Sequence, residues 1–170
     1  MKAPEISREL LEHCMNRSVA KVSDTMLSQS IEAAKPEDLS EAKVDMPIEL
    51  DSLEKPIYVG SVGFVGDING VVYLTASQSV MEKATARITG SDKAGTEMVS
   101  DVCGEIANML GGGFKNALAD KGHVSTLTIP TVLNGCDLYV SSIGVSLYLR
   151  FRYTLFGERI IVDLAMAKIV

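Results

Sequence analysis

The chain has 170 residues and a formal net charge of −6, with a sequence pI near 4.9. This acidic balance argues against a nucleic-acid-binding surface, which would need clustered Lys and Arg. The length favours a single domain over residues 1–170, and 46% hydrophobic residues are enough for a sizeable core. We therefore expect a globular protein whose partner is a small molecule or a protein with a basic patch.

The cysteines and histidines form no metal-binding or disulfide pattern. Cys14, Cys103 and Cys136 are odd in number and widely spaced, and His13 and His123 lie far apart. This spacing predicts reduced, buried thiols, histidines that are exposed or cap helices, and no zinc site. The sequence has neither a signal-peptide pattern nor an apolar run approaching about 20 residues, so we expect a cytoplasmic protein without a membrane span.

The first third of the chain reads as a helix followed by an irregular region. Apolar residues recur at helical spacing over residues 7–28 and predict an amphipathic helix. The polar segment 33–43 predicts a loop. Apolar and polar residues alternate over 44–51, which predicts a strand that lies at an edge or is irregular, because Pro47 cannot donate a ladder hydrogen bond.

A hairpin and a short helix should follow. Residues 57–65 and 71–76 read as strands joined by a turn at 66–70, where Asn and Gly tolerate positive φ. Residues 79–82 resemble a capping box that opens a helix, and Gly90 is placed to end that helix.

A long helix should start at Thr96 or Ser100 and end at Gly122. Residues 124–132 read as one strand, which must pair on one side or contain a bulge because Pro130 lies inside it.

The remaining sequence reads as sheet. Residues 134–135 (Asn-Gly) predict a turn, and 143–154 form the clearest two-residue alternation in the chain. A turn at 157–158 should lead into a last strand over 160–170. We thus predict an α+β fold: an extended, mainly antiparallel sheet packed by long helices. A faint likeness between residues 64–72 and 155–162 suggests a pseudo-twofold internal repeat.

The long helix carries a stripe of polar residues. Asp101, Glu105 and Asn108 are spaced four and three apart, so a helix places them on one face. Such stripes are usually solvated surface. The apolar residues expected on another face are Met98, Val102, Ile106, Met109 and Phe114.

Three glycines at 111–113 follow the stripe. They lack the spacing of a phosphate-binding loop. Each costs a helix roughly 1 kcal/mol relative to Ala, so we expect another element to approach the helix closely there. The alternative is that the missing side chains make room for a docked partner.

The run Asp101-x₃-Glu105-x₂-Asn108, with Pro130 about twenty residues later, resembles the signature of the CheC/CheX/FliY family of chemotaxis phosphatases. The chain is short and carries one such signature, as CheX-like members do. The resemblance extends to Gly104, Gly112, Gly122, residues 66–72 and residues 130–135.

The resemblance implies a CheC-like fold and a phosphatase that acts on a phosphorylated CheY-type response regulator. It assigns Asn108 to the orientation of the attacking water and Glu105 to pairing with a lysine of the regulator. Supporting or docking roles would fall to Asp101, Gly104, Gly112 and Pro130. This chain would bind no cofactor, Mg²⁺ would be held by the regulator, and the protein would form a homodimer.

A second function remains open. The same fold could serve as a non-catalytic response-regulator-binding module or a flagellar-switch-type assembly module. The Glu105 and Asn108 pair argues against it, because a scaffold does not need that pair.

Overall fold

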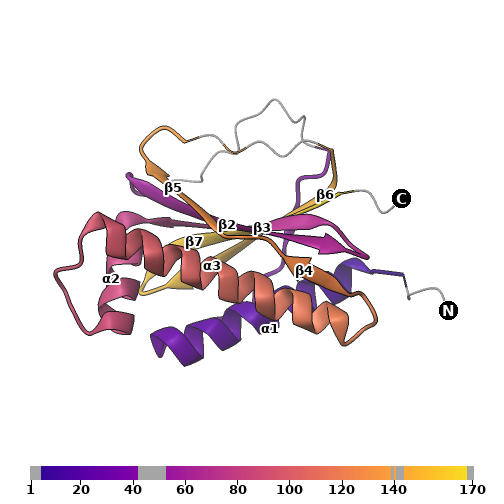
Figure 1. Ribbon diagram of the computed structural model, residues 1–170, viewed down its shortest axis with the longest axis horizontal. Coiled ribbons are helices and arrows are strands. Elements are labelled where there is room, and N and C mark those ends of the chain that lie inside the picture. Colours follow the sequence, from indigo (N-terminus) through magenta and orange to yellow (C-terminus); the bar gives the residue numbers. More distant parts are fainter. Residues whose placement is uncertain (1–4, 42–52, 139, 141–143, 168–170) are drawn as a thin grey trace.

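The computed structural model describes residues 5–41, 53–138, 140 and 144–167, which fold into helices packed on one sheet (Figure 1). This is the predicted α+β architecture. The described elements, in chain order, are α1 (Arg8–Leu27), β1 (Glu37–Asp38), β2 (Ile57–Gly66), β3 (Gly70–Ser77), α2 (Gln78–Thr89), α3 (Thr96–Ala119), β4 (Ser125–Leu127), β5 (Thr131–Gly135), β6 (Val145–Leu155) and β7 (Glu158–Ala167).

The strands are antiparallel and follow the order β1-β6-β7-β3-β2-β4, with β5 also paired to β2. Two hairpins, β2–β3 and β6–β7, meet at the central β3–β7 pair. The outer strand of each hairpin pairs with an edge strand from the other half of the chain: β6 with β1, and β2 with β4 and β5. This reciprocal exchange matches the predicted pseudo-twofold repeat.

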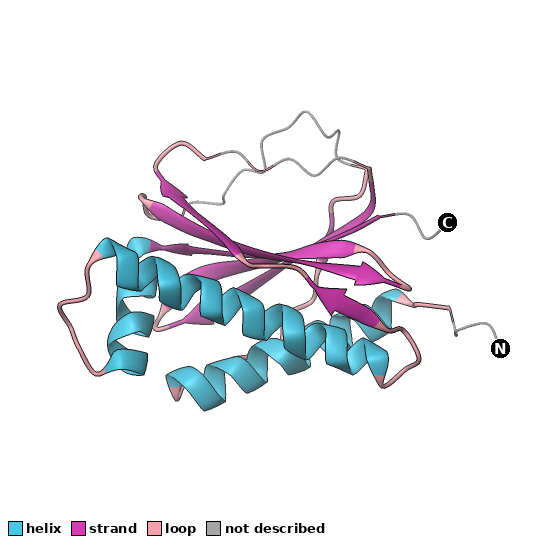
Figure 2. Cartoon of the chain, in the orientation of Figure 1, coloured by secondary structure: helices cyan, strands magenta, loops and turns pink. Residues whose placement is uncertain are grey.

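The three helices of the described ranges cover the same face of the sheet (Figure 2). α1 begins where the side chain of Ser7 accepts a hydrogen bond from the Leu10 amide (3.2 Å) and ends at Ser28, whose φ is 51°. The core beneath the helices includes the rings of Phe64 and Phe114, whose centroids are 5.8 Å apart. Helix α3 therefore packs directly on β2.

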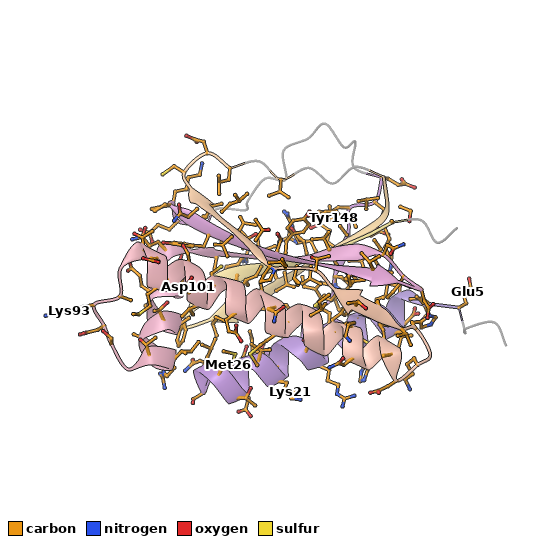
Figure 3. All side chains as sticks on the ribbon, viewed as in Figure 1. Glu5, Lys21, Met26, Lys93, Asp101 and Tyr148 are labelled. Carbon is orange, nitrogen blue, oxygen red and sulfur yellow. The ribbon has the colours of Figure 1, made fainter. Side chains whose placement is uncertain are left out.

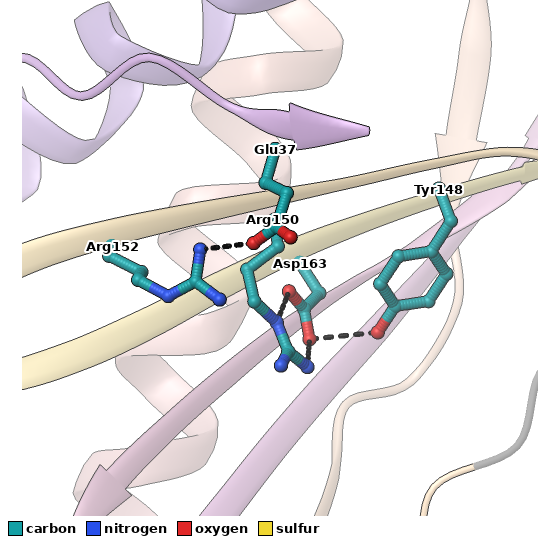
Figure 4. Close-up of polar contacts among 5 residues, drawn as sticks. All are labelled: Glu37, Tyr148, Arg150, Arg152 and Asp163. Carbon is teal, nitrogen blue, oxygen red and sulfur yellow. Dashed lines mark hydrogen bonds and ion pairs between the residues drawn. The ribbon is translucent and has the colours of Figure 1, made fainter. Parts of the chain in front are cut away.

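The opposite face of the sheet is partly buried and contains an ion pair (Figure 4). Arg150 Nε lies 2.9 Å from Asp163 Oδ1, and Tyr148 donates its hydroxyl to Asp163 Oδ2 at 2.8 Å. Arg150 and Asp163 are 3% and 2% exposed. Burial, the Asp163 carboxylate and its hydrogen bond raise the pKa of Tyr148, so its proton stays in this network.

The predicted capping box at residues 79–82 is wrong. The side chain of Ser77 accepts from the Val80 amide (3.2 Å) and caps α2, while Ser79 donates to Glu158 Oε2 at 2.8 Å. Glu158 also pairs with Lys83 (2.8 Å). Ser79 is therefore held by the β6–β7 turn, a contact between residues far apart in sequence. The predicted end of this helix at Gly90 is confirmed.

The single strand predicted over residues 124–132 is divided in two, whereas the irregular pairing predicted at Pro130 is confirmed. Two short strands, β4 and β5, pair in succession with β2. Phe64 and Ser61, three apart in β2, pair with Leu127 and Thr131, which are four apart. The additional residue and the missing Pro130 amide interrupt the ladder there. The turn predicted at 134–135 lies instead within β5, opposite Tyr58 and Ile57.

Other predictions have mixed outcomes. The predicted loop at 33–43 contains the two-residue strand β1, whereas the strand predicted at 44–51 lies outside the described residues. Cys14 and Cys103 are buried, and burial raises the pKa of the Cys103 thiol to about 12, but Cys136 is exposed. His13 is exposed as predicted, whereas His123 is buried and its backbone amide donates to the Leu118 carbonyl at the end of α3 (3.0 Å). Across the described ranges, no helix is both long and apolar enough to cross a membrane.

Candidate functional site

Helix α3 presents the predicted polar stripe to solvent. Asp101 and Glu105 are exposed and Asn108 is half-buried, whereas Val102 and Ile106 are 7% and 5% exposed. Figure 3 labels Asp101 in the first half of α3. The structure thus places the three signature side chains on one accessible face of a helix whose other side is in the core.

Met98 was assigned to the core face, and this is wrong because its side chain is 42% exposed. It precedes Asp101 by three residues and Glu105 by seven, so the helical period places it on the polar stripe. Val99, which is 2% exposed, occupies the core position instead. The stripe therefore begins with an exposed apolar side chain.

Close packing fixes α3 on the sheet. A Cβ atom at Gly60 would lie 3.0 Å from Ala107 Cβ and 3.1 Å from Cys103 Sγ, and one at Gly104 would lie 3.3 Å from Val132 Cγ2. These contacts fall within the five residues of α3 that precede Asn108, so Asn108 is mounted on a helix with little freedom to shift. Because Gly104 has no side chain, it allows β5 to pack closely against α3.

The glycines at 111–113 confirm the expected close approach at two positions. A Cβ at Gly111 would overlap Val62 Cγ1, and one at Gly113 would overlap Ser18 Oγ. Ser18 also donates to the Leu110 carbonyl at 2.8 Å, joining α1 to α3. At Gly112 the nearest atom, Leu127 Cδ1, is 3.7 Å away, an ordinary contact. Packing within the described residues does not require glycine there.

The link between β4 and β5 runs beside the C-terminal end of the stripe, at Asn108. Leu127 faces Gly112 and Val132 faces Gly104, so residues 128–131 pass alongside the intervening part of α3, which contains Asn108. Pro130 lies half-buried in this link. The structure thus brings Pro130 to the same region as the stripe, although the two are distant in sequence.

Ile129 was not singled out by the sequence. Its side chain is 87% exposed, the highest value among the large hydrophobic residues that the structure describes. The available signal was an isoleucine directly before a proline, at the point where strand alternation must break. That signal indicates an irregular backbone but not an exposed side chain.

The chemistry available at the stripe is binding and orientation. Among the described residues, Glu105 and Asn108 have no side-chain hydrogen-bond or ion-pair partner. A free carboxylate can pair with a cation, and a carboxamide can both donate and accept hydrogen bonds. In the described part of the chain, no three His, Cys, Asp or Glu side chains gather in a way that could hold a metal ion.

Comparison with known proteins gives consistent matches. The family model described as "Chemotaxis phosphatase CheX" matches residues 58–149. The chain is 30% identical over 112 residues to the CheY-P phosphatase CheX of Thermotoga maritima, which covers 64% of this chain and 72% of that relative.

Two solved structures share the fold. The chemotaxis protein CheX from Desulfovibrio desulfuricans has a TM-score of 0.76 at 18% identity, covering 92% of this chain and 98% of that one. A chain of the CheX–CheY–BeF₃–Mg²⁺ complex from Borrelia burgdorferi has a TM-score of 0.71 at 19% identity, covering 92% and 97%. The family match spans more than half of the sequence and includes the whole of α3, so this chain belongs to the chemotaxis phosphatase CheX family.

Proposed function

We propose that this protein dephosphorylates a phosphorylated CheY-type response regulator. The observation that carries the proposal is the pair formed by exposed Glu105 and half-buried Asn108. They lie one helical turn apart on a tightly packed helix, in a chain of the CheX family. The CheY-P phosphatase named among the relatives supports the same reaction for this chain.

Asn108 is proposed to orient the attacking water. The aspartyl phosphate is an acyl phosphate, which is already activated, so the reaction needs a water held in line with phosphorus more than a strong base. The carboxamide oxygen accepts from the water and its N–H donates to a phosphoryl oxygen. The water oxygen then bonds to phosphorus while the bond between phosphorus and the acyl oxygen breaks, which releases phosphate and the free aspartate. A neutral amide adds no negative charge beside the phosphate.

Glu105 is proposed to dock the regulator by pairing with a lysine of its active site. The carboxylate is exposed and lies three residues from Asn108, so the same approach brings the phosphoryl group to the amide. Asp101, one turn earlier, adds negative charge to the docking face. The proposal assigns Mg²⁺ to the regulator, since the described residues of this chain offer no group of metal ligands.

The test is the decay of a radiolabelled phosphorylated regulator with and without this protein. Wild type should accelerate decay, and Asn108→Ala should lower the accelerated rate about 100-fold or more, because orientation of the water is lost. Asn116→Ala is the matched control, since Asn116 is exposed two turns further along the same helix. Full activity of Asn108→Ala would refute the mechanism.

Glu105 is tested by charge reversal. Glu105→Lys should weaken binding of the phosphorylated regulator, because two cations would then face each other. Asp120→Lys, at the exposed C-terminal end of α3, is the control with the same charge change. If wild type bound the regulator without accelerating decay, the non-catalytic binding role would replace the proposed activity.

A further inference from the structure

Ile129 combines high exposure with a fixed backbone. Thr128 donates its amide to the Gly63 carbonyl at 2.8 Å, and the Gly63 amide donates to Thr128 Oγ1 at 2.9 Å. On the other side, Pro130 restricts the backbone of Ile129 to extended conformations. An apolar side chain that is 87% exposed is thus held in a short, anchored segment. Burying the Ile129 side chain at an interface would therefore cost little additional backbone entropy.

Ile129 also lies beside the proposed reaction centre. The contacts of Gly104 with Val132 and of Gly112 with Leu127 mark two points about 12 Å apart along α3. Asn108 is midway between these points in sequence, and Ile129 is near the middle of the segment that joins Leu127 to Val132. A protein whose phosphoryl group reaches Asn108 must therefore pass close to Ile129.

We propose that Ile129 is an apolar anchor that contacts the phosphorylated receiver domain and helps to determine which regulator is accepted. This inference rests on the proposed function, because it places Ile129 on the same docking face as Glu105 and Asn108. The matching partner surface carries an apolar recess next to its phosphorylated aspartate and a lysine for Glu105. A central apolar contact beside charged and polar contacts is the usual arrangement of a specific interface.

The experiment measures kcat and KM for dephosphorylation of the regulator by wild type, Ile129→Ser and Ile129→Leu. Ile129→Ser should raise KM about 10- to 100-fold, as expected when a buried isoleucine contact is lost, and leave kcat unchanged. Ile129→Leu keeps an apolar side chain of similar size, so its KM should stay close to that of wild type. Val124→Ser is the matched control, because Val124 is 62% exposed and directly precedes β4, at the end of that strand farther from Ile129.

Two outcomes would overturn the proposal while leaving the phosphatase function intact. One is a wild-type KM for Ile129→Ser, and the other is an equal rise in KM for Val124→Ser. A change in oligomeric state by Ile129→Ser, measured by light scattering at the assay concentration, would assign the side chain to a second copy of this chain and overturn the proposal as well. Failure of wild type itself to accelerate decay would refute both the function and this inference.

Discussion

Gly111 and Gly112 are neighbours in α3, yet the structure predicts opposite effects of alanine at the two positions. A Cβ at Gly112 would lie 3.7 Å from Leu127 Cδ1, which is an ordinary contact. A Cβ at Gly111 would overlap Val62 Cγ1. Val62 is 1% exposed and belongs to β2, which is paired on both sides. It cannot easily move away.

The expected magnitudes follow from two effects. Replacing glycine by alanine inside a helix stabilises the folded state by about 1 kcal/mol. Overpacking costs about 1–3 kcal/mol, and the upper end applies at Gly111 because β-branched Val62 has few rotamers. Gly112→Ala should therefore stabilise the protein by about 1 kcal/mol, whereas Gly111→Ala should destabilise it by about 2 kcal/mol.

Urea unfolding followed by circular dichroism measures the free energy of unfolding of both variants, and equal m-values would show that the unfolded states are comparable. A Val62→Ala background provides the control, because it removes the clashing Cγ1 atom. In that background Gly111→Ala should become stabilising. If the two glycine variants were equally stable, or if the Val62→Ala background did not change the sign, this account of helix packing would be wrong.

The alanine variants at Gly111 and Gly112 also distinguish a role in helix packing from a role in docking the regulator. Gly112 was predicted as a supporting or docking residue, and its own contacts within the described structure tolerate alanine. If Gly112→Ala raised stability but lowered the rate of regulator dephosphorylation, the absence of a side chain would serve the partner. Unchanged activity would leave Gly112 without a docking role.

Three other predictions concern stability and assembly. Asp163→Asn should lower the free energy of unfolding by about 3–5 kcal/mol, since it leaves buried Arg150 without its carboxylate; urea unfolding checks this, and a change under 1 kcal/mol would contradict it. Hydrogen bonds from Lys83 and Ser79 lower the pKa of the Glu158 carboxyl from its usual value of 4.5. The Glu158 carboxylate therefore stabilises the folded state above pH 4.5, and this stabilisation is lost as the pH falls through the folded-state pKa. The difference in Tm between wild type and Glu158→Gln should therefore shrink below pH 4.5, and a constant difference would refute the assignment. We also propose a homodimer, so light scattering at micromolar concentration should give twice the 18.2 kDa mass of the chain, and a species of 18.2 kDa alone would refute it.

Local sequence patterns determined the elements whose stabilising contacts are close in the chain. The hairpin β2–β3, the helix α1 with its Ser7 cap, and the stop at Gly90 follow from periodicity and from residues that favour caps and turns. The polar stripe on α3 follows in the same way, because helical spacing alone puts Asp101, Glu105 and Asn108 on one face.

Contacts between distant residues decided the rest. Ser79 matches a capping pattern, but its hydroxyl donates to Glu158 at the β6–β7 turn. The side chain of Ser77 therefore caps α2 instead. Whether β4 and β5 are one strand or two depends on the register of each with β2. Ile129 lies between these two strands and takes part in neither set of pairings. The sequence by itself therefore determined which residues form the candidate site, while only the tertiary structure decided what lies beside them, because strand pairing and helix packing join residues that no local pattern connects.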